Sequence, residues 1–279
     1  MQESKTGPGW SLNKRDPNII KKILPLLELQ YKYYFCVKSD GWENIPNGKV
    51  LLAGSHNGGL GSPDLGMFMY DWFSHFGVER ELYGLMHKMV WKFMPSVAES
   101  LEKFGAIVAH PIVANKAFKR GASVLVYPGG GKDVFRPFHL WNKIFFNGHK
   151  GFIKLALKED VPIIPVISVG AHHTLIVLGD ILPLLKELHK MGMPWPFGIE
   201  PEVAPIFLGS PWGVGIGPMP NIPWPTKIYI RICKPIELPK PKKGQKNLSS
   251  EREYVNECYD HITTIMQKEL DKLIEESSY

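Results

Sequence analysis

The stretch LLAGSHNGGLGSPDLGMF, residues 51–68, sets the architecture that the rest of the sequence follows. It opens with an apolar run that ends at Gly54 and is typical of a buried strand. Ser62 and Pro63 then supply the N-cap and the first position of a helix, and Asp64 falls in its first turn. A strand, a glycine-rich loop and a helix in this order predict one unit of an α/β fold.

The same alternation of apolar strands and helical segments continues along the chain. It predicts an α/β fold with a mixed, largely parallel sheet covered by helices. We expect strands at Val50–Gly54, Leu82–Met86, Ala106–Ala109, Ser123–Tyr127, Ile163–Val169 and Lys227–Cys233. We expect helices at Pro63–Phe76, His87–Phe104, Ala114–Lys119, Lys150–Lys158 and Ile181–Met191.

The two ends of the chain have patterns of their own, and we divide it into residues 1–40, 41–240 and 241–279. Asp16 and Pro17 open an N-terminal amphipathic helix that reaches about Phe35, with a kink expected at Pro25. This helix either packs on the core or lies at a membrane interface. Apolar residues at helical spacing after Ser250 predict a C-terminal packing helix.

A stretch rich in proline and glycine, residues 193–225, carries three tryptophans. We expect a long structured loop here, because its prolines do not fit a regular helix or a central strand. Tryptophan in such a loop suits either a membrane interface or a flap that packs on the core.

The composition excludes several classes of protein. The chain has 279 residues, of which 44% are hydrophobic, and three cysteines with no metal-ligand spacing. We therefore expect no metal site, no disulfide framework and a reducing compartment. The net charge of +6 favours an anionic partner. Because no nucleic-acid-binding motif is present, we do not expect that partner to be a nucleic acid. Neither a secretory leader nor a membrane span is expected from the sequence.

The loop that follows the first apolar run predicts acid–base chemistry. His56 lies in this loop, at the strand end where α/β sheets form ligand crevices. Asp64 is able to orient the imidazole and leave its other nitrogen free to take a proton. The simpler interpretation is that Asp64 only complements the helix dipole. Because no GxSxG nucleophile is present, a histidine base here would act on a substrate hydroxyl directly.

A second glycine-rich turn, Pro128-Gly129-Gly130-Gly131-Lys132, follows another strand. It lacks the first glycine and the Ser or Thr of a P-loop, so we reject a nucleotide site. The basic residues that follow it predict an anion site: Lys132, Arg136, Lys143 and Lys150. His172 and His173 follow the strand that ends near Val169, and we expect at most one of them to reach the site.

At this point the sequence resembles the PlsC-like glycerolipid acyltransferases, and most closely a bacterial-type branch with NHSGG and PGG motifs. The resemblance covers about residues 41–238, and the ordered set of motifs is more specific than any one of them. It rests on Gly41–Pro46, on Ser55–Gly59 with Asp64, on Tyr127–Gly130, on Phe146–Phe152 and on Val161–Val166.

The resemblance implies that residues 41–240 form an acyltransferase domain without a bound cofactor. It makes His56 the general base and Asp64 the residue that orients it. A fatty acyl group would pass from acyl-CoA or acyl-carrier protein to a lipid hydroxyl at a peripheral membrane surface, on the cytoplasmic side. The expected substrate-binding residues are Asn57, Gly58, Gly59, Pro128, Gly129, Gly130, Gly131, Lys132, Arg136, Lys143 and Lys150.

Several departures from the family pattern bear on the acceptor. The usual HxxxxD spacing would put the aspartate at Gly61, and the arginine expected to hold a glycerol phosphate is replaced by His110. A neutral alcohol such as diacylglycerol therefore competes with lysophosphatidic acid as the acceptor. A lipid-binding protein without chemistry and a thioesterase are the other interpretations that the sequence leaves open.

Overall fold

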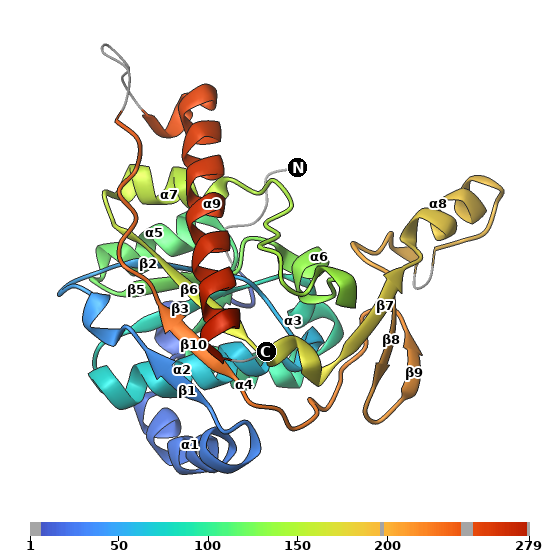
Figure 1. Cartoon of the computed structure of the whole chain (residues 1–279), viewed down its shortest axis with the longest axis horizontal. Helices are drawn as coiled ribbons and strands as arrows, with labels where there is room; N and C mark the ends of the chain where they lie inside the picture. The colour runs from blue at the N-terminus through green and yellow to red at the C-terminus, as the bar shows by residue number, and fades with distance from the viewer. Residues whose placement is uncertain (1–6, 196–197, 241–247, 278–279) are drawn as a thin grey trace.

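The computed structural model describes residues 7–195, 198–240 and 248–277 (Figure 1). Its centre is a seven-stranded sheet with the order β1-β10-β6-β2-β5-β3-β4. Five neighbouring pairs are parallel and β10 with β6 is antiparallel, so the prediction of a mixed, largely parallel sheet is confirmed. The strands are β1 (Lys38–Asp40), β2 (Leu51–Gly54), β3 (Leu82–Met86), β4 (Ala106–Val108), β5 (Ser123–Val126), β6 (Ile163–Val169) and β10 (Tyr229–Ile232).

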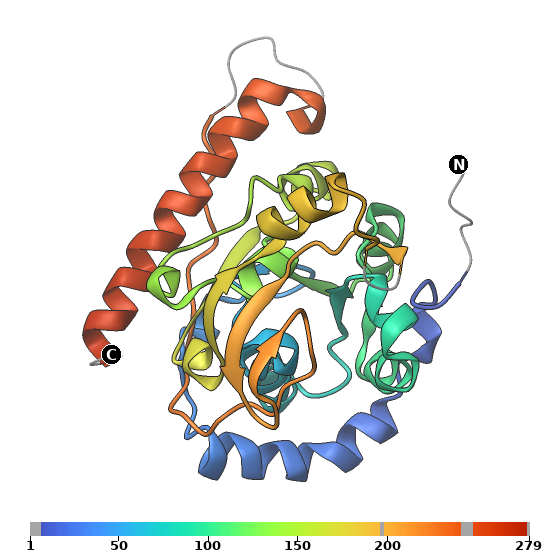
Figure 2. The same ribbon diagram turned by 90° about the vertical axis from the view of Figure 1, so that its right-hand side faces the viewer.

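Helices cover both faces of this sheet (Figures 1 and 2). β2 shows why: Leu51 and Ala53 point into one hydrophobic cluster and Leu52 into another, and all three are fully buried. Alternate residues of a strand face opposite sides, so a strand that is apolar throughout needs a layer on each side. The first cluster includes α5 (Pro111–Lys119), α7 (Gly151–Glu159) and α9 (Arg252–Ser277), and the second includes α1 (Pro17–Leu29) and α2 (Pro63–Phe76).

The predicted helices are present with two local differences. The long helix expected at residues 87–104 is divided at Pro95 into α3 (Met89–Phe93) and α4 (Pro95–Phe104), because proline lacks the amide that a continuous helix would need. α1 begins after Asp16, whose Oδ1 accepts hydrogen bonds from two backbone amides, and it passes into a π-helical turn, Gln30–Tyr34.

The expectation of a long loop over residues 193–225 is wrong in its middle part. Two strands lie there, β8 (Pro205–Gly209) and β9 (Gly213–Ile216), and together with the earlier strand β7 (Ile176–Asp180) they form a second, antiparallel sheet. Phe207 is fully buried opposite Gly215, and a Cβ at Gly215 would lie 2.2 Å from its ring. The glycines that suggested a loop therefore make room for an aromatic side chain between strands.

The small sheet projects beside the main one, with α8 (Leu182–Lys190) inserted between β7 and β8 (Figure 1). Several large apolar side chains on and after β9 are exposed to solvent. Among the residues described, no helix combines the length and the apolar character that crossing a bilayer requires.

Candidate functional site

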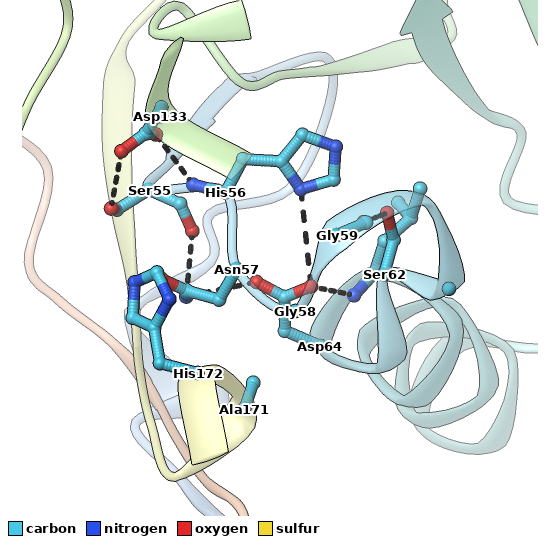
Figure 3. A network of polar contacts seen from close by, with 12 residues as sticks. Ser55, His56, Asn57, Gly58, Gly59, Ser62, Asp64, Asp133, Ala171 and His172 are labelled. Atoms are coloured by element: carbon cyan, nitrogen blue, oxygen red, sulfur yellow. Dashed lines mark hydrogen bonds and ion pairs between the residues drawn. The ribbon is translucent and has the colours of Figure 1, made fainter. Parts of the chain in front are cut away.

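The two residues predicted as a dyad lie at opposite ends of one loop. The loop begins where β2 ends at Gly54, and α2 begins after Ser62. Gly58 and Gly59 have φ values of 82° and 68°, a left-handed conformation that favours glycine and turns the chain back on itself. As a result His56 Nδ1 lies 4.0 Å from Asp64 Oδ1 (Figure 3).

The surroundings set the charge of both groups. The Asp64 side chain is 2% exposed, and its carboxylate accepts hydrogen bonds from Asn57 Nδ2 at 3.0 Å and from the Leu65 amide at 2.8 Å. Burial raises the pKa of Asp64 to about 7. Burial, together with the nearby charge of Arg136, lowers the pKa of His56 to about 4. The imidazole is therefore neutral at pH 7 and able to accept a proton.

The distance of 4.0 Å is too long for a hydrogen bond, and His56 Nδ1 is buried without a partner among the described residues. Catalytic hydrogen bonds are often long without substrate and shorten in the complex. An unpartnered buried nitrogen beside a buried carboxylate favours such a shortening, because both atoms would gain a partner.

An aromatic ring fixes the plane of the imidazole. Tyr127, the residue after β5, stacks on His56 with ring centroids 4.5 Å apart and an angle of 23° between the planes. A Cβ at Gly54 would lie 2.5 Å from the Tyr127 ring, so a larger residue at this position would displace the tyrosine. The lack of a side chain at Gly54, the last residue of β2, therefore leaves room for the Tyr127 ring.

A buried ion pair, which the sequence analysis did not identify, supports the loop from the other side. Asp133 on the short helix α6 (Gly130–Val134) is fully buried and accepts hydrogen bonds from the His56 amide at 2.6 Å and from Ser55 Oγ at 3.4 Å. Figure 3 shows this carboxylate beside the backbone of His56. Asp133 also pairs with Arg136, which is 2% exposed. The i, i+3 spacing of these two residues is the one sequence signal for the pair, and it does not indicate that the pair is buried.

Arg136, which we expected to bind an anionic substrate, is used inside the protein. Its guanidinium donates to Asn57 Oδ1 at 3.2 Å and to the Trp141 carbonyl at 3.3 Å, and it contacts His172 Nε2. His172 itself is buried and His173 is only partly buried, in a 3-10 turn rather than a strand. Arg136 therefore joins the predicted loop residue Asn57 to the Asp133 carboxylate.

The predicted lysines differ in their surroundings. Lys132 and Lys143 are exposed. Lys150 Nζ donates to Asn256 Oδ1 on α9 at 2.7 Å and lies over the ring of Tyr259. The four cations of the predicted anion site therefore lie in different surroundings.

The second glycine turn is tightly packed. Gly129 has no room for a side chain, because a Cβ would lie 2.2 Å from Asp133 Cβ. The Gly130 amide donates to the Tyr127 carbonyl at 3.3 Å, and the Pro128 carbonyl contacts the His149 ring at 2.7 Å.

A carboxylate lies beside this turn. A Cβ at Gly131 would lie 3.0 Å from Glu202 Oε2. A Cβ at Gly130 would lie 3.2 Å from Glu202 Oε1. The turn that we expected to attract an anion therefore has an acidic neighbour.

A cavity of about 150 Å³ lies next to the Arg136 network and is lined in part by Trp141, Ser168 and His172. His56 is not among its lining residues, and access to the imidazole is from its solvent side, where 19% of the side chain is exposed. Across the described part of the chain, no group of three or more His, Cys, Asp or Glu side chains is arranged to hold a metal ion.

The chain is similar to several known proteins. Uncharacterized proteins of Mycobacterium bovis and Mycobacterium tuberculosis are 30% identical over 223 residues, which cover 79% of this chain and 58% of theirs. The chain thus spans little more than half the length of these relatives. A Gallus gallus protein named "DGAT1/2-independent enzyme synthesizing storage lipids" is 26% identical over 176 residues, covering 61% of this chain and 50% of that protein.

Among solved structures, the 1-acyl-sn-glycerophosphate (LPA) acyltransferase PlsC from Thermotoga maritima aligns with 90% of this chain and 79% of its own. The identity is 18% and the TM-score 0.49. The model of the protein family described as Acyltransferase matches residues 36–169, a range that runs from just before β1 to the end of β6 and contains the dyad and both glycine turns. Residues 36–169 thus match the acyltransferase family, as the motifs predicted.

Proposed function

We propose that the protein is an O-acyltransferase that moves a fatty acyl group from acyl-CoA or acyl-carrier protein to a hydroxyl of a glycerolipid. The observation that carries this proposal is the approach of His56 to the buried Asp64 at the end of β2. The match of residues 36–169 to the acyltransferase family supports the reaction class. A protein that only bound lipid would not need a neutral imidazole held against a carboxylate.

The reaction follows from the positions of these groups. His56 Nε2 takes the proton of the acceptor hydroxyl while the hydroxyl oxygen attacks the thioester carbonyl. Asp64, once ionised, stabilises the imidazolium through Nδ1 and keeps Nε2 directed at the substrate. When the tetrahedral intermediate collapses, the C–S bond breaks and the imidazolium returns its proton to the leaving thiolate. No covalent acyl-enzyme is formed.

We propose a lysophospholipid, such as lysophosphatidic acid, as the acceptor, with a neutral alcohol as the second candidate. Several observations support the neutral alcohol. Arg136 is paired with Asp133, Lys150 is bonded to α9, and Glu202 lies beside the glycine turn. Two of the four cations expected to bind a phosphate, Arg136 and Lys150, are thus engaged within the protein. The printed name of the Gallus gallus relative, which refers to storage lipids, points the same way.

We also propose that the protein works as a peripheral protein on the cytoplasmic face of a membrane. Residues 203–226 contain no charged side chain, and Trp212, Val214 and Ile216 are exposed there. Tyr34 Oη donates to the Pro223 carbonyl at 2.8 Å, which joins this surface to the exposed end of the N-terminal helical segment. Exposed tryptophan among apolar residues is typical of a lipid–water interface.

The test is an assay of purified protein with radiolabelled palmitoyl-CoA, or palmitoyl-carrier protein, in mixed micelles. Lysophosphatidic acid, another lysophospholipid, diacylglycerol and a long-chain alcohol are offered as acceptors. We expect labelled ester from the wild type and a loss of about 10²- to 10⁴-fold in His56→Ala.

His75→Ala is the matched control, because His75 Nε2 lies 3.9 Å from Asp71 in a second histidine–aspartate pair on α2. It should retain the wild-type rate. If the wild type binds these lipids but labels none of them, the protein is a lipid-binding protein. Release of free palmitate would instead identify a thioesterase.

A further inference from the structure

The loop that carries His56 and Asp64 is also held by a side chain that is distant in the sequence. Asn221 Nδ2 donates to the Gly58 carbonyl at 3.1 Å, and its Oδ1 accepts from the Gly61 amide at 3.0 Å. Asn221 is 9% exposed and lies 160 residues after Gly61. One carboxamide thus closes the loop between His56 and Asp64 by pairing with a carbonyl and an amide of its backbone.

Asn221 and its neighbours lie so close to the loop that Gly59 and Gly61 have no room for a side chain. A Cβ at Gly59 would lie 2.7 Å from Asn221 Oδ1, and one at Gly61 would lie 2.7 Å from Pro223. The residues after the second sheet therefore pack directly on the backbone of the loop.

The segment that carries Asn221 is attached beside the small sheet, at points just after β8 and just before β7. Ile222 pairs with Ser210 as an antiparallel bridge, and its amide donates to the Ser210 carbonyl at 2.8 Å. The Trp224 amide donates to the Thr174 carbonyl at 3.1 Å. These two backbone bonds, made by residues just after Asn221, fix its position, so the carboxamide holds the loop from a supported segment.

We propose that Asn221 is a positioning residue, which sets the separation of His56 and Asp64 by clamping residues 58–61 to the second sheet. The inference rests on the proposed acyl transfer for its catalytic consequence, but the clamp itself is a property of the loop. The loop here is three residues longer than the HxxxxD spacing, which puts the aspartate at position 64 instead of 61. A longer loop loses more conformational entropy when it is ordered, and the two bonds from Asn221 offset part of that cost.

Two readouts that need no catalytic activity test the clamp in the full chain. The first is hydrogen–deuterium exchange of peptides that cover residues 55–64. In Asn221→Ala we expect exchange there to be about fivefold faster, because the Gly61 amide loses its acceptor. The second is the NMR titration of His56, whose pKa should rise toward the ordinary value as water enters the loop.

Asn221→Asp separates the two bonds. The carboxylate is still able to accept from the Gly61 amide but no longer donates to the Gly58 carbonyl, so exchange should be slower than in Asn221→Ala and faster than in the wild type. Gln267→Ala is the matched control. Gln267 bridges the Ile144 amide and the Asn142 carbonyl, both at 2.9 Å, from α9. Its loss should leave the exchange of residues 55–64 and the His56 titration unchanged.

Kinetics then test the positioning role. In Asn221→Ala we expect kcat to fall about 10- to 100-fold with KM for the acyl donor unchanged, since a small displacement of catalytic groups affects the chemical step most. Asn221→Asp should recover part of that loss. Thermal unfolding of each variant shows that it is folded at the assay temperature.

The outcomes separate the two proposals. Unchanged exchange and an unchanged His56 titration in Asn221→Ala would refute the clamp. Altered exchange with kcat within about twofold of the wild type would refute the positioning role. If the wild type forms no ester with any acceptor, the proposed function fails, while the exchange and the titration still decide whether Asn221 holds the loop.

Discussion

Replacing Asp133 by alanine should destabilise the protein more than removing the whole ion pair. Asp133 is fully buried and Arg136 is 2% exposed, so the single variant leaves an uncompensated guanidinium inside the protein. Burial lowers the pKa of Arg136 to about 9, which still leaves it charged at pH 7. Removing one partner of a buried pair costs about 3–5 kcal/mol. This is a large part of the roughly 5–15 kcal/mol by which such proteins are stable.

The double variant Asp133→Ala/Arg136→Met removes the buried charge as well. What remains is the cost of the polar groups left without a partner, about 1–3 kcal/mol: the His56 amide and the Ser55 hydroxyl lose their acceptor, and Asn57 Oδ1 and the Trp141 carbonyl lose a donor. Arg136→Met should therefore restore roughly 2 kcal/mol in the Asp133→Ala background. Urea unfolding at pH 7, followed by tryptophan fluorescence and circular dichroism, measures each free energy. A double variant at least as unstable as Asp133→Ala would refute the reasoning.

Three further predictions follow from the same geometry. Asp64→Asn should lower kcat by about 10²-fold and abolish the rise of kcat with pH near 7, since the pKa of about 7 is that of the Asp64 carboxyl. The same variant should be more stable to urea than the wild type at pH 8. The raised pKa means that stability from Asp64 is present at low pH and lost as pH rises through 7. Gly54→Ala should lower stability by about 1–3 kcal/mol in thermal unfolding, because its Cβ meets the Tyr127 ring. Ile216→Glu should reduce sedimentation with anionic vesicles, and Val97→Glu, which changes another exposed apolar residue, on α4, should not.

The main sheet could be predicted because its strands are apolar throughout and are separated by clear helical patterns. β3, β6 and α2 begin and end at the residues expected. β1 and the second sheet could not be predicted in the same way. β1 is three polar or charged residues, Lys38–Asp40, and it becomes a strand only because β10 is available to pair with it. Such tertiary pairing leaves little trace in a local pattern.

The approach of His56 to Asp64 was predictable because both residues lie in one short stretch with a recognisable helix start. The support of this loop comes from residues up to 163 positions away, Asp133, Arg136 and Asn221 among them. For Arg136 the sequence indicated a free cation near a glycine turn. Its burial and its pairing with Asp133 depend on the fold of residues 130–141, which composition and spacing do not specify.

The pairing of β1 with β10 has a consequence for how the chain folds as it is synthesised. Arg231 on β10 binds Asp40 on β1 across 191 positions of sequence, and β10 is also the partner of one edge of β6. β6 is made about 60 residues earlier and all seven of its residues are buried in the finished sheet. Its apolar edge stays open on the ribosome until β10 emerges, and open edges of this kind pair with other chains. The central sheet is therefore completed late, and one edge of β6 has no partner strand until β10 has been made.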